Sequence, residues 1–514
     1  MNQAVSTRTP ASPRLLYAIV MVTGAAVMIL ELLGTRLIGP FYGVSLYVWS
    51  SLIAVTLIAL AAGYFLGGYL ADRVSSLQLS HIIAFSAFTT ILIPFLNGPV
   101  LRMTDHLGLR VGAFISALIL FLLPLTALAM VGPYVIKRTT HDLSGVGTIA
   151  GSVYAVSTVG SVAGTLLLGF YLLPEFGTKA IISALSLSLG ASALAVAWHE
   201  RSMTSPSRLL IVLPVLAATV GIGAAAGGTV PATNVEGFTI RSETESLYGW
   251  VRVVDDNRHG YRLMLSDASV LSAVDLNQNR SLLGYQEIIG LLPTVHRTAT
   301  RALLIGLGGG HVARDLETKG IVTDTIEIDP AVAEGARRWF HFEPTGLFLV
   351  GDARHEIKQL PGRYDLIIHD CFTGGAEPTH LLTQEMMREL RGLLNEHGIL
   401  ALNYVGFRTG EGSEAVAAVY RTIKTVFPHL KAFVTDQADF TDFIFLASEH
   451  PLAIGPSFDD LRVQWLVNHE HQFMAAEGFV ITDDYNPMES RQVRKAETYR
   501  KHFIERVAFD LLLR

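Results

Sequence analysis

Three acidic residues, Glu327, Asp352 and Asp370, each follow or end an apolar run in the second half of this 514-residue chain. Such a run is typical of a buried parallel strand, and ligands bind at the carboxyl ends of those strands. A carboxylate there can accept hydrogen bonds from ribose hydroxyls or from an amino group, and it can take a proton from a nucleophile. The pattern therefore predicts one binding edge with room for a nucleoside and an acid–base group.

A glycine loop, with Gly306, Gly308 and Gly309, directly follows the first of these apolar runs. Glycines let backbone N–H groups approach a ligand closely. The loop departs from Gly-x-Gly-x-x-Gly, and Glu327 follows it by about 20 residues, the spacing of a ribose-binding carboxylate. Acidic residues at successive strand ends suit an adenosyl ligand better than a dinucleotide, so we favour an S-adenosylmethionine-type (SAM-type) fold over a nicotinamide-binding one.

The elements that position these residues follow from the apolar periodicity. From residue 302 onward, apolar strands alternate with amphipathic segments such as Thr383–Leu394, which predicts a parallel sheet flanked by helices. Two β-rich runs around the turn Asp255–Gly260 predict a hairpin ahead of that sheet. We therefore expect a β-hairpin region with a linker helix at 231–300 and a class I methyltransferase-like Rossmann domain at 301–514.

Residues 1–230 have sparse charges and long apolar runs, which predicts an α-helical, multi-pass domain in the inner membrane. Spanning the hydrocarbon core takes about 20 apolar residues. Seven spans are expected, at Leu15–Leu37, Val48–Tyr69, His81–Leu101, Val111–Val135, Thr148–Leu173, Lys179–Trp198 and Leu209–Gly227. The Lys and Arg distribution favours a cytoplasmic N-terminus. With seven spans that would place the soluble half outside the cytoplasm, whereas a SAM-type donor is cytosolic, so both orientations stay open.

The charge and the cysteine content argue against a nucleic-acid partner and an internal disulfide. The net charge is −6 and the C-terminal half has no basic patch with interleaved aromatics, so we expect no nucleic-acid partner. A single cysteine, Cys371, rules out an internal disulfide. We also predict no metal site from the sequence.

The hairpin region, Tyr285-Gln286-Glu287 ahead of the glycine loop, Glu327, Gly351-Asp352 and Asp370 together resemble spermidine synthase. That family transfers an aminopropyl group from decarboxylated SAM to putrescine and releases methylthioadenosine. With its apolar N-terminal half and the segment Thr482–Pro487, the whole chain resembles the membrane-fused spermidine synthase-like proteins.

The resemblance implies that Glu327 holds the ribose hydroxyls, that Asp352 with Ala353 holds the adenine, and that the glycine loop completes the donor site. The donor is then decarboxylated SAM or SAM itself, used as a substrate with no permanently bound cofactor. The further partners implied are a polyamine acceptor, the lipid bilayer and a second copy of the chain in a homodimer.

The same resemblance implies that Asp370 is catalytic and accepts or orients the proton of the attacking amine. Tyr285 would share the catalytic centre, and Gln286 would line the donor and acceptor channel. His369 precedes Asp370 by one residue, so strand alternation directs its side chain to the other face.

Three departures from the family concern the amine groups. Gly309 stands where the family has an aspartate that binds the donor's free amine, and the motif Asp370–Gly374 lacks the second carboxylate. Ser281 and Leu282 replace an acidic pair. Burying a diamine without carboxylate partners costs several kcal/mol. The sequence thus predicts a retained nucleoside site and an acceptor site that has lost its carboxylates.

The leading prediction is a membrane-bound enzyme that cleaves decarboxylated SAM or SAM and releases methylthioadenosine, by aminopropyl transfer to an amine or by intramolecular attack. One alternative is a polyamine-related transporter whose soluble domain senses an adenosyl ligand. The other is a SAM-dependent methyltransferase, which would release adenosylhomocysteine.

Overall fold

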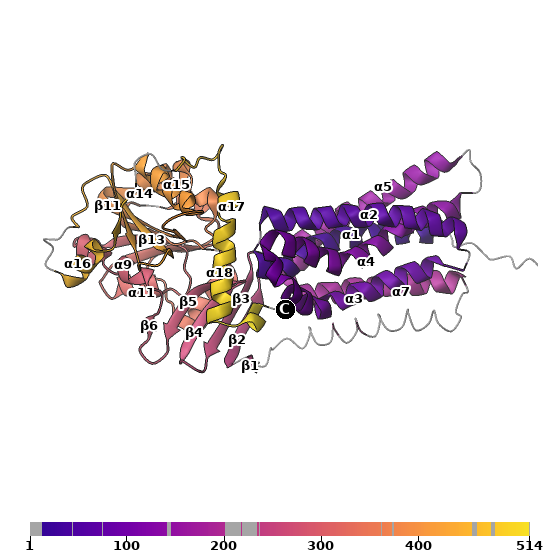
Figure 1. Cartoon of the computed structure of the whole chain (residues 1–514), viewed down its shortest axis with the longest axis horizontal. Coiled ribbons are helices and arrows are strands. Elements are labelled where there is room, and N and C mark those ends of the chain that lie inside the picture. The colour runs from indigo at the N-terminus through magenta and orange to yellow at the C-terminus, as the bar shows by residue number, and fades with distance from the viewer. Residues whose placement is uncertain are drawn as a thin grey trace, which may run out of the picture. The chain divides into compact units, whose positions relative to one another are not determined.

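The computed structural model describes residues 13–43, 45–74, 76–140, 145–200, 217, 221, 234–235, 237–360, 362–372, 375–454, 460–473 and 478–512 (Figure 1). The chain forms two compact units, one of Met1–Thr229 with the last two residues and the other of Val230–Leu512.

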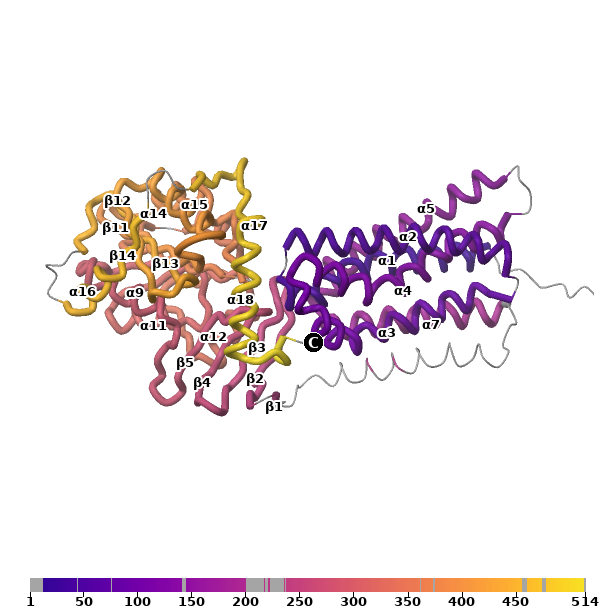
Figure 2. The backbone as a smooth tube through the Cα atoms, in the orientation of Figure 1, coloured from indigo at the N-terminus to yellow at the C-terminus, as the bar shows by residue number. Residues whose placement is uncertain are grey.

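The N-terminal unit is helical, and its long helices pack side by side (Figure 2). Their bounds are α1 Pro13–Tyr42, α2 Leu46–Arg73, α3 Leu79–Thr104, α4 Gly108–Thr139, α5 Val146–Leu167 and α7 Thr178–Glu200. A π-helical turn, η3 (Leu168–Leu172), continues α5 into the short α6 (Leu173–Glu175). A 3₁₀ turn, η1 (Asp105–Leu107), separates α3 from α4, and Gly108 after it has a φ of +73°.

Five helical runs in the described part of this unit are long and apolar enough to cross a membrane. One of them, Leu79–Thr139, contains both α3 and α4. The predicted count of seven spans is therefore not confirmed. The last predicted span, Leu209–Gly227, lies outside the described residues except for two positions.

Small residues set the helix contacts in this unit. Gly67 on α2 faces α4 so closely that a Cβ would lie 2.7 Å from the carbonyl oxygen of Met130. Similarly, a Cβ on Gly164 of α5 would lie 2.8 Å from the Cα atom of Ala25 on α1. Such close backbone approach lets neighbouring helices gain van der Waals packing energy.

The second unit begins with a six-stranded sheet in the order β1-β2-β3-β4-β5-β6. Its strands, all antiparallel to their neighbours, are β1 Asn234–Val235, β2 Phe238–Glu245, β3 Trp250–Asp256, β4 Tyr261–Ser266, β5 Ser269–Asp275 and β6 Arg280–Ser281. The predicted hairpin is β3–β4, so it is one part of a larger sheet. Two short helices, α9 (Tyr285–Ile289) and α10 (Leu292–Val295), follow.

An eight-stranded sheet comes next, in the order β14-β12-β13-β11-β10-β7-β8-β9. Its strands are β7 Arg301–Ile305, β8 Val322–Glu327, β9 Phe348–Val350, β10 Tyr364–His369, β11 Leu394–Phe407, β12 His429–Val434, β13 Phe440–Ser448 and β14 Glu470–His471. The five strands from β9 to β11 are parallel, as predicted, and the other three are antiparallel. A short connection joins β12 to β13, and strands joined that way can only pair antiparallel. This is the fold of class I SAM-dependent methyltransferases.

Helices cover both faces of this sheet because its strands are apolar on both sides. On β7, Ala302 and Leu304 enter one hydrophobic core and Leu303 and Ile305 the other. The helices that follow β7 are α11 His311–Glu317, α12 Pro330–Phe340, α13 Ala353–Glu356, α14 Gln384–Leu393, α15 Ser413–Lys424, α16 Leu461–Val467, α17 Met488–Arg491 and α18 Val493–Arg506. Figure 1 shows α14 and α15 on one side and α9 and α11 on the other.

Candidate active site

The glycine loop between β7 and α11 uses conformations that favour glycine. Gly306 has a φ of +92° and lies against the backbone carbonyl of Asp370, leaving no space for a Cβ. At Gly308, with a φ of +52°, a Cβ would lie 2.8 Å from the carbonyl oxygen of Leu271. The loop therefore passes close to the end of β10 and to β5, which brings the predicted donor loop beside the predicted catalytic residue.

Glu327 ends β8 and is buried beneath this loop. One carboxylate oxygen accepts a hydrogen bond from the backbone N–H of Leu307 at 2.9 Å, and the other accepts one from Asp329 at 2.9 Å. Burial raises the pKa of Glu327 to about 7. Glu327 thus ties the glycine loop to the end of β8 as well as facing the cavity described below.

Asp352 follows β9 and caps α13, where its Oδ1 accepts hydrogen bonds from the backbone N–H groups of Arg354 at 3.0 Å and His355 at 3.3 Å. Its other oxygen lies 3.0 Å from Nε2 of His380. Ala353 is buried directly after it. The capping bonds hold Asp352 at the strand edge, with one oxygen directed away from the helix.

Asp370 follows β10 and joins three other side chains. The hydroxyl of Tyr285 donates to its Oδ2 at 2.6 Å, and Nδ2 of Asn403 donates to its Oδ1 at 3.0 Å. Nε2 of Gln286 donates to the Tyr285 hydroxyl at 3.2 Å. Burial raises the pKa of Asp370, and burial together with the charge of Asp370 raises the pKa of Tyr285 well above its usual value. Tyr285 therefore stays a hydrogen-bond donor and orients the carboxylate.

These residues meet at one cavity of about 750 Å³, which is large enough for a nucleoside and an acceptor. Of the predicted site residues, its lining includes Gly306, Gly308, Glu327, Asp352, Ala353, Asp370 and Tyr285. The other two predicted site residues, Gly309 and Gln286, are not among the described residues that line this cavity. Gly309 packs against Ser272 and His311 instead. Gln286 acts on the cavity through the hydroxyl of Tyr285.

The cavity also has acidic residues that the sequence reasoning missed. Asp436 and Asp442, from the β12–β13 connection and β13, line the same cavity as Asp370. Burial raises the pKa of Asp442 to about 6, and the charges of Asp370, Glu377 and Asp436 add to the shift. The motif positions supply no further carboxylate, but these two acidic side chains from elsewhere in the chain line the same cavity. In the sequence, the acidic residues repeated within Asp436–Asp442, between two apolar runs, are the pattern that could have indicated these cavity residues.

Helix α18 supplies a further wall that the sequence reasoning did not anticipate. Tyr499 and His502 line the cavity from this helix. At its first turn, the buried Lys495 forms an ion pair with the buried Glu377 and lies 3.9 Å from the ring centroid of Tyr404. This pair ties α18 to the sheet.

Two neighbours of Asp370 have other surroundings. His369 is fully buried on the opposite face, where its Nε2 lies 3.2 Å from the carbonyl oxygen of Leu381 and burial lowers its pKa to about 4. Burial raises the pKa of Cys371 well above its usual value, so this thiol is a poor nucleophile. Thr373 and Gly374 of the predicted motif lie outside the described residues.

Comparison with known proteins gives two kinds of relative. Polyamine aminopropyltransferase of Vibrio vulnificus is 39% identical over 138 residues, which are 26% of this chain and 46% of that protein. Thermospermine synthase ACAULIS5 of Arabidopsis thaliana is 22% identical over 49% of this chain and 76% of its own length. This chain is similar to these two polyamine-forming transferases over part of its length. No family model matches it.

The other relative is an N-terminal histidine N-methyltransferase of Emericella nidulans, 28% identical over 426 residues, which are 76% of this chain and 74% of that protein. That share is larger than the Val230–Leu512 unit, so the similarity extends into the N-terminal unit. Both kinds of relative are transferases.

Among solved structures, a probable spermidine synthase from Corynebacterium glutamicum covers 51% of this chain and 94% of its own, with 17% identity and a TM-score of 0.38. Human methyltransferase-like protein 13 in complex with SAH covers 42% of this chain and 91% of its own, with 19% identity and a TM-score of 0.28. The fold assignment rests on the strand order rather than on these scores.

Proposed function

We propose that this chain transfers an alkyl group from an adenosyl sulfonium donor to an amine nitrogen. The observation that supports this most is the Tyr285–Asp370–Asn403 network, which opens into the same cavity as the glycine loop. A sulfonium is already an excellent leaving group. The protein therefore has mainly to orient the amine, take its proton and exclude water.

At the donor end, the glycine loop, Glu327 and Asp352 would hold the nucleoside. Glu327 is fixed by two backbone N–H bonds and keeps lone pairs for ribose hydroxyls. Asp352 is fixed by its capping bonds in the same way. Groups fixed before binding lose little freedom when the ligand arrives, which favours affinity.

At the acceptor end, the carboxylates of Asp370, Asp436 and Asp442 attract a cationic amine to the cavity. The amine must lose a proton before it can attack, and a carboxylate whose pKa is raised is a better base for that step. Asp370 is the proposed base because its two oxygens are oriented by Tyr285 and Asn403.

In the leading form of this reaction, an aminopropyl group is transferred. The amine nitrogen attacks the chain carbon bonded to the sulfonium, the carbon–sulfur bond breaks, and its electron pair stays on sulfur. The products are the alkylated amine and methylthioadenosine, and the proton passes to Asp370. Attack by the donor's own carboxylate or amine is the intramolecular variant. The relationship to polyamine aminopropyltransferases supports this form.

A second candidate, N-methylation with adenosylhomocysteine as product, is favoured by two observations. The relative whose similarity extends into both units is an N-methyltransferase. In addition, no carboxylate is available at Gly309 for the amine of decarboxylated SAM. Its neighbour His311 is neutral there, because burial lowers the pKa of this imidazole to about 4.

One experiment tests both forms. Full-length protein purified in detergent is incubated with SAM or decarboxylated SAM, with and without putrescine or a peptide that begins with histidine, and the nucleoside product is identified by mass spectrometry. Methylthioadenosine identifies chain transfer, and adenosylhomocysteine identifies methyl transfer. Neither product with either donor would contradict the proposed function.

We also propose that residues 1–230 anchor residues 231–300 and 301–514, the catalytic part, in the inner membrane as a homodimer. The five candidate spans support the anchor. Protease protection of a C-terminal tag in sealed vesicles determines on which side the catalytic part lies, and light scattering of the detergent complex determines its oligomeric state.

A further inference from the structure

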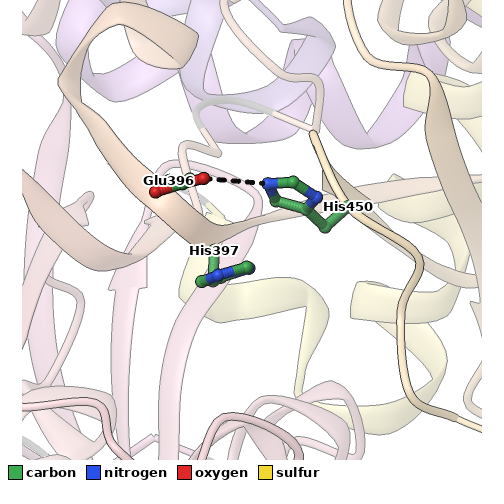
Figure 3. Close-up of side chains that lie close together, drawn as sticks. All are labelled: Glu396, His397 and His450. Carbon is green, nitrogen blue, oxygen red and sulfur yellow. Dashed lines mark ion pairs between the residues drawn. The ribbon is translucent and has the colours of Figure 1, made fainter.

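Three side chains of types that can bind a metal lie outside the cavity, near the opposite ends of the strands of the eight-stranded sheet. Glu396, His397 and His450 each offer one ligand atom, and these atoms lie within 4.8 Å of one another (Figure 3). Asp370 follows the carboxyl end of β10, and β11 runs parallel to β10. Glu396 and His397 are near the amino end of β11, so they face away from the donor site.

The strand register explains why residues 53 positions apart in the chain meet. Leu400 on β11 pairs with Ala447 on β13, and extending this antiparallel ladder by three residues places His397 opposite His450. The hydroxyl of Ser448 donates to the carbonyl oxygen of Gly398 at 2.9 Å and holds the two segments together there. The two imidazole rings have centroids 4.5 Å apart.

The chemistry of the three groups suits a transition metal. Two imidazoles and one carboxylate are ligands that Zn²⁺ and its neighbours prefer, whereas Ca²⁺ and Mg²⁺ prefer oxygen alone. Oε1 of Glu396 lies 3.9 Å from Nε2 of His450, which is beyond hydrogen-bond reach and leaves space for a bridging ion. In the part of the chain that the structure describes, neither ring has a hydrogen-bond partner that would compete for its nitrogen atoms.

The surroundings allow an ion to enter. The Glu396 side chain is 82% exposed and that of His450 is 44% exposed, so the ion would exchange with solution. Arg391, on the adjacent helix α14, is neutralised by an ion pair with Glu449. Three protein ligands leave a coordination position for water.

We infer that Glu396, His397 and His450 bind a divalent transition metal, with Zn²⁺ as the expected ion. The ion would join the amino end of β11 to the chain that leaves β13. It would lie roughly 20 Å along β11 from Asn403, at about 3.3 Å per residue, so its role is to stabilise the α/β unit and not to take part in transfer.

The test uses the full-length protein after treatment with a chelator. Zn²⁺ is titrated in competition with a chromophoric chelator, Co²⁺ is added separately for its absorption spectrum, and thermal unfolding is followed with and without Zn²⁺. The expected result is one tightly bound Zn²⁺ per chain with a higher melting temperature. His397→Ala and His450→Ala should each lower the affinity at least about tenfold. His341→Asn, which removes an exposed imidazole elsewhere and keeps a residue that tolerates its positive φ, should leave binding unchanged.

Stoichiometric binding lost in both alanine variants supports the site. Absence of Zn²⁺ binding in the wild-type chain, or unchanged binding in His397→Ala and His450→Ala, would overturn it. If an alanine variant unfolds, Glu396→Gln decides the matter, because this exposed position tolerates the change and the loss of a charged ligand should still weaken binding. Loss of the transfer reaction when Zn²⁺ is removed from the wild-type chain would contradict the separation from the cavity.

Discussion

The two ends of the cavity are built in different ways. The proposed donor end consists of backbone groups and strand-end carboxylates, such as Glu327, that lie within one stretch of sequence following β7, β8 and β9. The proposed acceptor end combines Asp370 with Asp442 of β13 and with α18, elements that are distant in sequence. Under the proposed function, a nucleoside would be recognised by a local motif, whereas the group that receives the alkyl chain would be selected by how distant elements pack. Changes at the two ends should therefore have separable effects.

The largest effect is expected from Lys495→Met, which removes one partner of the buried ion pair with Glu377. An uncompensated buried charge costs about 3–5 kcal/mol. Denaturant unfolding of the full-length protein should show a loss of this size for the α/β unit. In the fraction that stays folded, the Michaelis constant for the acceptor should rise more than that for the donor, because α18 lines the acceptor end.

The double variant Lys495→Met with Glu377→Gln is the matched control, and it should recover most of the lost stability. A single variant as stable as wild type would show that the pair does not hold α18 in place.

Asp370→Asn should lower turnover by at least about a hundredfold, because loss of a general base costs about 10²–10⁴ in rate. Asparagine keeps an oxygen for the Tyr285 hydroxyl, so the fold and the donor affinity should stay close to those of wild type. Single-turnover formation of the nucleoside product measures the rate, and calorimetry measures donor binding. Retained turnover in a well-folded variant would leave Asp370 without a catalytic role.

Glu327→Gln should weaken binding of the donor and leave binding of the acceptor unchanged. Loss of charge-assisted hydrogen bonds to ribose should weaken donor binding by roughly 1.5–3 kcal/mol. The variant should also melt at a lower temperature, because an amide N–H₂ replaces one of the two oxygens that accept bonds from Leu307 and Asp329. Calorimetry that finds unchanged donor affinity would contradict this role.

The pKa of Glu327 adds a pH test. It is raised to about 7, so the carboxylate is charged above that pH and protonated below it. Donor affinity in the wild-type protein should therefore fall between pH 8 and pH 6, here chosen as about one unit on each side. The Glu327→Gln variant should lack this change.

The smallest effect is expected from Asp442→Asn at the acceptor end. Because its pKa is raised to about 6, the folded protein binds this proton more tightly than the unfolded chain does, and the charged form costs stability as pH rises through that value. The variant should gain stability at neutral pH and lose affinity for a cationic acceptor. Thermal melts and acceptor Michaelis constants at pH 7.5, roughly 1.5 units above that pKa, measure both. A variant with lower stability and unchanged acceptor affinity would contradict the assignment.

Much of the donor end could be predicted from the sequence. The positions of Glu327, Asp352 and Asp370 at strand ends followed from apolar periodicity, since a buried parallel strand is apolar on both faces. The loop glycines were recognisable because few other residues adopt their positive φ angles. The place of Gly309 in the motif predicts ligand contact, yet its packing against Ser272 depends on β5, which no local pattern could place there.

What the sequence by itself determined is therefore the class of fold, the alternation of strands and helices, and the strand ends that carry the proposed donor site, because these follow from side-chain periodicity within short segments. Only the tertiary structure decided that Asn403 hydrogen-bonds Asp370, that Asp436 and Asp442 supply the acidity missing from the motif, and that the outer strands run antiparallel. It also brought His397 opposite His450. Each of these depends on register between segments far apart in the chain, and register is set by packing of the whole sheet rather than by any one segment.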